Sequence, residues 1–106
     1  MTTRDFDWLV GLLEGEGCFM HSSPGAPPRI AIHMKDEDVM QRVGRLFERK
    51  VIWLHPPSHR AKGWSPLWRC TLSGSPALDM MERLLPGMGE RRSAKIVEIL
   101  TANGRM

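Results

Sequence analysis

The chain has 106 residues, which is enough for one domain with a single hydrophobic core and too few for two. Its 42% hydrophobic and 25% charged residues are typical of a globular protein and argue against a disordered chain. Fifteen lysines and arginines against twelve acids give a net charge of +3, a mild excess that is compatible with nucleic-acid binding. We therefore expect one domain over residues 1–106.

The cysteines and the hydropathy argue against a secreted, disulfide-bonded protein and against a membrane-spanning protein. Cys18 and Cys70 form neither a CxxC pair nor a disulfide framework, so we expect both to be buried thiols in a reducing compartment. The N-terminus lacks a charged segment followed by an apolar run, so no signal peptide is expected. The apolar run at 9–13 is far shorter than the ~20 residues of a membrane span. The sequence predicts a soluble, intracellular protein with no membrane partner.

Helices and pairs of strands alternate along the chain. The first helix is expected to begin near Thr3 or Asp5, whose side chains can cap it. Strands are recognised by alternation and helices by apolar residues at spacings of three and four. The expected order is a helix over 3–16, strands over 18–23 and 29–35, a helix over 36–50, strands over 51–55 and 67–74 around a long loop, and helices over 76–85 and 93–104.

This order predicts an α+β fold in which helices cover one face of a four-stranded antiparallel sheet. The alternation in 29–35 assigns Ile30, Ile32 and Met34 to the covered face. The other face then carries basic residues and almost no acid, which indicates a nucleic-acid surface. Tryptophans at 53, 64 and 68 could stack on bases, but we expect them to pack in the core or in the second strand pair.

The segment WLVGLLEGEGCF, residues 8–19, ends an apolar helix with three glycines and two glutamates. Gly11 and Gly15 lie one turn apart and form a flat stripe, against which the same helix of a second subunit could pack closely. Two Glu16 side chains would then meet near the two-fold axis, where like charges need a cation between them. Carboxylate oxygens suit Mg²⁺, which can activate water for attack on a phosphodiester.

The stretch LVGLLEGEG, Leu9 to Gly17, resembles the LAGLIDADG motif of homing endonucleases. The order of helices and strands is similar to that family over nearly the whole chain, and one motif in about a hundred residues resembles its homodimeric branch. The resemblance implies an αββαββα homodimer joined through the motif helix. It implies a site-specific, Mg²⁺-dependent endonuclease that cuts both strands of a long pseudo-palindromic DNA site, with Mn²⁺ or Ca²⁺ able to substitute in binding.

The family's functional residues carry over to matching positions of this chain. Glu16 matches the catalytic, metal-binding acid, and Glu14 matches a more structural acid. Gly17 matches a second metal-binding position, where the backbone passes closest to the scissile phosphate. Asp36 matches a position that organises the catalytic water, and Arg91 (or Arg92) matches a peripheral basic residue. The implied DNA-binding residues are Met20, Ser22, Arg29, His33, Lys35, His55, Arg60, Lys62 and Arg69, and the implied dimer interface is Trp8, Gly11, Leu12 and Gly15.

Other functions remain open from the sequence. A relative that has lost cleavage could act as a DNA-binding regulator or as an RNA-splicing maturase, and only the nuclease requires Glu16 and a metal. A protein-interaction module would use the glycine stripe but not the basic face. A zinc site built from Cys18, His21, His33 and Cys70 is disfavoured, because their spacing matches no common zinc pattern.

Overall fold

The computed structural model describes residues 1–21 and 25–106. The expected succession of helices and strands is confirmed, with one short helix added. The elements are α1 (Thr3–Glu16), β1 (Cys18–Met20), β2 (Arg29–Met34), α2 (Glu37–Phe47), β3 (Ile52–Leu54), α3 (Pro57–Ala61), β4 (Leu67–Ser73), α4 (Ser75–Leu84), the 3₁₀ turn η1 (Leu85–Gly87) and α5 (Glu90–Ala102).

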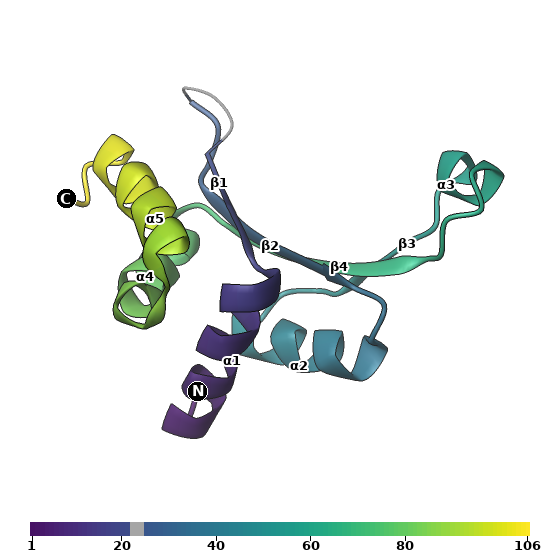
Figure 1. Ribbon diagram of the computed structural model, residues 1–106, viewed down its shortest axis with the longest axis horizontal. Coiled ribbons are helices and arrows are strands. Elements are labelled where there is room, and N and C mark those ends of the chain that lie inside the picture. The colour runs from purple at the N-terminus through teal and green to yellow at the C-terminus, as the bar shows by residue number, and fades with distance from the viewer. Residues whose placement is uncertain (22–24) are drawn as a thin grey trace.

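The four strands form one antiparallel sheet in the order β1-β2-β4-β3. Two hairpins, β1–β2 and β3–β4, are joined through the central pair β2–β4, so the predicted four-stranded sheet is confirmed. The helices α1, α2, α4 and α5 lie on one side of this curved sheet, whereas α3 projects beyond the end of β3 on the other side (Figure 1). The other face of the sheet is left open.

The core lies between the sheet and these four helices. Residues directly opposite each other on paired strands point to the same face, so the row Phe19, Ile30 and Leu72 packs inward together. The row of Ile32 and Cys70 does the same. Apolar side chains from all four helices complete the cluster, and no described polar side chain is buried in it. The expected assignment of Ile30, Ile32 and Met34 to the covered face of the sheet is therefore confirmed.

Helix α1 is capped by Thr2, one residue before the expected start. The Thr2 hydroxyl accepts a hydrogen bond from the Asp5 backbone N–H at 3.0 Å, and the Asp5 carboxylate accepts one from the Thr2 N–H at 3.3 Å. The helix ends at Gly17, where a Cβ atom would lie 2.8 Å from the Leu13 carbonyl oxygen. Only glycine allows the chain to turn from α1 into β1 at this distance.

Helix α2 ends at Phe47, three residues before the expected boundary. Glu48 adopts a left-handed conformation with φ 54°, which stops the helix. A Cβ atom at Gly44 would lie 2.7 Å from the Val51 side chain and 3.0 Å from the Arg49 carbonyl oxygen. Glycine therefore lets the segment 49–51 pass close to α2 on its way to β3.

Two further expectations are corrected by the structure. The long loop between β3 and β4 contains the short helix α3, and Pro57 is the first residue of this helix. Cys18 is exposed, because its position opposite Ala31 puts its side chain on the open face, whereas Cys70 is buried as expected. Among the described helices, none combines the length and the apolar character that crossing a membrane would require.

Candidate nucleic-acid interface

The open face of the sheet is hollowed into a trough of about 650 Å³. All four strands contribute to it, together with the segment between α2 and β3. The residues that line the trough are Met20, Arg29, Ala31, His33, Arg49, Lys50, Ile52, Arg69, Thr71 and Ser73. Four of these side chains are cations and none is an acid, so the trough is a positively charged concave surface that can attract polyanions.

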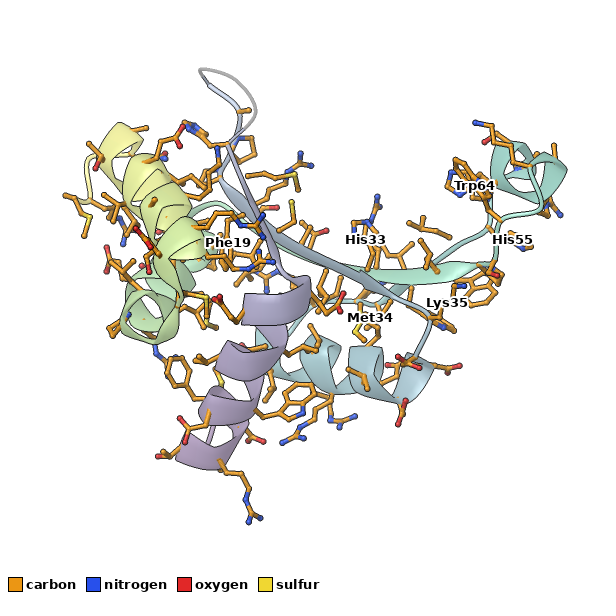
Figure 2. All side chains as sticks on the ribbon, in the orientation of Figure 1. Phe19, His33, Met34, Lys35, His55 and Trp64 are labelled. Carbon is orange, nitrogen blue, oxygen red and sulfur yellow. The ribbon has the colours of Figure 1, made fainter. Side chains whose placement is uncertain are left out.

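His33 and Arg69 are cross-strand neighbours in the floor of the trough. His33 stands on the concave side of the sheet (Figure 2). Partial burial, together with the charge of Arg69, lowers the pKa of His33 below its usual value. The Arg69 Nε–H is buried and has no hydrogen-bond partner among the described residues. None of the residues that line the trough is an acid, so the Arg69 guanidinium meets no carboxylate there and is available to an oxygen anion.

Charge is separated along the chain in a way that matches the two layers of the fold. Residues 17–35 and 49–78, which contain all four strands and α3, carry seven lysines and arginines and no acid. The remainder, which is mostly helical, carries eight lysines and arginines against all twelve acids. The sheet segments thus have a net charge of +7 and the remainder −4, although the whole chain is only +3.

Four of the nine predicted DNA-binding residues meet in the trough, namely Met20, Arg29, His33 and Arg69. Lys35, His55, Arg60 and Lys62 lie outside it, after β2 or around α3, and Ser22 falls outside the described residues. Sequence reasoning missed Arg49 and Lys50, because it placed both in a helix that ends before them. The sequence signal for these two cations was their place in a run of three charged residues, 48–50, directly before β3.

The C-terminal end of α1 is held by α5. The Arg92 guanidinium donates hydrogen bonds to the backbone carbonyl oxygens of Glu14, Gly15 and Gly17. The Glu14 carboxylate accepts a hydrogen bond from the Gly89 N–H, at the start of α5, at 3.0 Å. A cation thus meets the negative end of one helix and an anion the positive end of the other, so both contacts are favourable.

The remaining predicted catalytic residues lie apart from each other within one chain. Glu16 is exposed, and its carboxylate makes no hydrogen bond or ion pair with the described residues. Asp36 is exposed at the start of α2. Arg91 is exposed, and it is Arg92 that reaches the end of α1.

The predicted dimer stripe of α1 is only partly open. Gly11 and Gly15 are exposed, and a Cβ atom added to either would meet nothing within 4 Å. Trp8 and Leu12 are half-buried against the core, and the Arg42 guanidinium lies over the Trp8 ring at 4.1 Å. A second helix could therefore approach most closely at the glycines.

One described chain does not build a metal site by itself. No group of three or more histidine, cysteine, aspartate or glutamate side chains comes together in the part of the chain that the structure describes. The zinc set from the sequence is divided, because Cys70 points into the core while Cys18 and His33 belong to the open face.

The chain was also compared with known proteins. No family model, no curated protein and no solved structure matches it. The likeness to the LAGLIDADG endonucleases therefore rests on the motif at Leu9 to Gly17 and on the order of the elements. It stays a prediction.

Proposed function

We propose that this protein binds double-stranded DNA in the trough. The observation that carries the proposal is the separation of charge, with a net +7 on the acid-free sheet segments. Lysines and arginines that neutralise phosphates release condensed counterions, and this release drives binding to DNA. The acids of the other layer would repel the same phosphates, which favours one orientation of the duplex against the protein.

The shape of the trough supports a duplex as its occupant. The sheet is concave, and β1 and α3 rise at its two ends (Figure 1). Arg29 and Arg69 extend from paired central strands, where they can contact phosphates as well as base edges, at which arginine prefers guanine. Arg49 and Lys50 lie in an exposed turn and are suited to phosphates. The trough thus combines possible base and backbone contacts on one surface.

We further propose that two chains pair through α1 and that the pair cleaves DNA with Mg²⁺. The exposed Gly11 and Gly15 offer a close approach for the partner helix, and an exposed Glu16 follows directly at the helix end. The two Glu16 carboxylates would hold the metal, which when bound supplies a Lewis acid for phosphodiester hydrolysis. Arg92 would fix the helix ends and so position Glu16 for this role.

A protein that binds DNA without cleaving it is the second candidate. The Gly17 carbonyl, the second predicted metal ligand, already accepts a hydrogen bond from Arg92. The contacts of Arg92 therefore give the end of α1 a structural role in the fold. A DNA-binding regulator, or a maturase acting on RNA, would keep the trough and these contacts and would have no need of Glu16.

The two candidates are separated by incubating the protein with genomic DNA of the organism that carries its gene, in Mg²⁺ or EDTA, and sequencing the ends produced. We expect double-strand cuts at one or a few sites in Mg²⁺ only. Glu16→Gln should lower the cutting rate by about 1,000-fold, because it removes the metal-binding charge, while duplex affinity is unchanged. Glu98→Gln, in the exposed face of α5, is the matched control and should cut normally.

Each result points to one candidate. Cuts that are lost in EDTA and in Glu16→Gln support the nuclease. Tight duplex binding without cuts favours the regulator, and a preference for structured RNA over DNA favours the maturase. Cuts that persist in Glu16→Gln would remove Glu16 from the proposed role.

A further inference from the structure

The indole of Trp64 is exposed in the long connection between β3 and β4, just after α3. Its side chain follows α3 and is 52% exposed, on the side of α3 that faces the concave surface of the sheet (Figure 2). The His59 ring lies 4.8 Å away in a tilted arrangement, and the Lys62 ammonium lies over the indole at 4.6 Å. The indole is therefore held in place by two cationic or titratable neighbours while much of its surface stays open.

The other two tryptophans of this hairpin have a different role. Trp53 and Trp68 are cross-strand neighbours with ring centroids 4.5 Å apart, and Trp68 packs against the core. By the alternation of the strands, both belong to the helix-bearing side of the sheet. The expected packing in the core or in the strand pair is confirmed for these two residues and is wrong for Trp64.

The surroundings of Trp64 select a negatively charged partner. His59, Arg60 and Lys62 lie within five residues of it, and no acid occurs between Glu48 and Asp79. Two cross-strand pairs, Trp53–Trp68 and Leu54–Leu67, separate this end of the sheet from the row that contains His33 and Arg69 in the trough. An exposed aromatic ring flanked by cations is the arrangement on which proteins stack the bases of single-stranded nucleic acid.

We propose that Trp64 stacks on an unpaired base of a single strand that continues from the duplex in the trough. The Lys62 ammonium lies over the indole ring, and Trp64 still keeps about half of its surface, 52%, exposed for a base. Arg60 and Lys62 would contact the phosphates on either side of that base. The proposal builds on duplex binding in the trough, but its single-stranded part can be measured separately.

The test compares three DNA probes by fluorescence anisotropy at low salt. These are a blunt random-sequence duplex, the same duplex with a short oligothymidine overhang, and the oligothymidine alone. For the wild-type protein we expect the overhang to tighten binding by roughly tenfold, as stacking of one base would. Trp64→Ala should lose this gain and keep the affinity for the blunt duplex. Trp53→Ala removes a tryptophan of similar exposure, 50%, from the other side of the sheet and should keep the gain.

The outcomes distinguish this proposal from the one it builds on. An overhang gain that survives in Trp64→Ala, or no gain in the wild type although the blunt duplex binds, would overturn the role of Trp64 and leave the trough intact. Oligothymidine binding that depends on Trp64, without any duplex binding, would support the stacking site and overturn the proposed function. Thermal melting of both variants verifies that each is folded.

Discussion

The two layers of this molecule use their charged residues in different ways. In the helical layer, several charges are paired within the chain: Arg42 contacts Asp5 at 3.2 Å, and Arg105 contacts Asp79 at 2.8 Å and Glu82 at 3.2 Å. In the sheet layer, the four cations of the trough form no ion pair among the described residues. The first set of charges helps to join helices, and the second is available to a partner.

Arg92 in the helical layer and Arg69 in the sheet layer show the same difference. Arg92 donates to three backbone carbonyls at the end of α1, so its guanidinium is used inside the fold. Arg69 has a buried Nε–H without a described partner, in the floor of a trough without acids. We infer that the first arginine contributes to stability and the second to binding. Substitutions in the two layers should therefore produce separable effects.

The largest effect is expected from Gly15→Leu in the helical layer. Gly15 meets nothing within 4 Å in one chain, so a leucine there should leave the monomer folded. If two chains pair through α1 as proposed, it would separate the two helices and raise the dimer dissociation constant by about 100-fold. Light scattering measures the mass of the protein in solution. Ala94→Leu, at an exposed position of α5, is the control. A Gly15→Leu protein that remains dimeric would exclude this interface.

Arg92→Ala should cost the fold about 2 kcal/mol, because three carbonyls at the end of α1 lose a charged donor. Urea denaturation monitored by circular dichroism gives this difference. Arg91→Ala removes the neighbouring exposed arginine and should change the free energy of unfolding by less than ~0.5 kcal/mol. Equal losses in the two variants would contradict the structural role of Arg92.

Arg69→Ala should weaken duplex binding by roughly tenfold at low salt and leave the fold intact. It removes one trough cation, so the slope of log affinity against log salt should become shallower by about one unit. Lys95→Ala removes one cation from the helical layer, where Lys95 pairs with Glu98, and should leave both values unchanged. If Lys95→Ala weakened duplex binding as much as Arg69→Ala, the assignment of DNA binding to the sheet layer would be contradicted.

The smallest effect concerns pH and His33. Burial and the charge of Arg69 lower the pKa of His33 in the folded protein below the ordinary 6.5. Below about pH 6.5 the unfolded chain therefore binds more protons, and stability falls as the pH is lowered towards the folded-state pKa. Urea midpoints at pH 7.5 and 5.5 should show a small decrease that is reduced in His33→Gln. An identical decrease in both proteins would assign it to other groups.

Sequence reasoning recovered the features that depend on local patterns. Alternation in β2 predicted which of its residues face the core, and the apolar spacing over 36–50 predicted the helix α2. The boundary of α2 was wrong, because a left-handed Glu48 and the close approach at Gly44 depend on tertiary packing. That error hid Arg49 and Lys50, which complete the trough.

Long-range contacts were beyond the sequence. The Glu14 carboxylate meets the Gly89 N–H, and Arg92 meets the end of α1, across more than seventy residues of chain. No local pattern encodes which of two adjacent arginines will face α1. The exposure of Trp64 depends on α3, a short helix inside a segment rich in loop-forming residues. The charge pattern of the sequence therefore located the candidate site, but it did not identify all of the residues that line it.

The salt dependence of duplex binding tests the central claim most directly. The wild-type protein would be titrated into a labelled random-sequence duplex over a series of salt concentrations. If the four trough cations Arg29, Arg49, Lys50 and Arg69 each neutralise a phosphate, log affinity should fall with log salt with a slope of about −4 per chain. A flat response, or no binding at low salt, would contradict the assignment of the open sheet face to DNA.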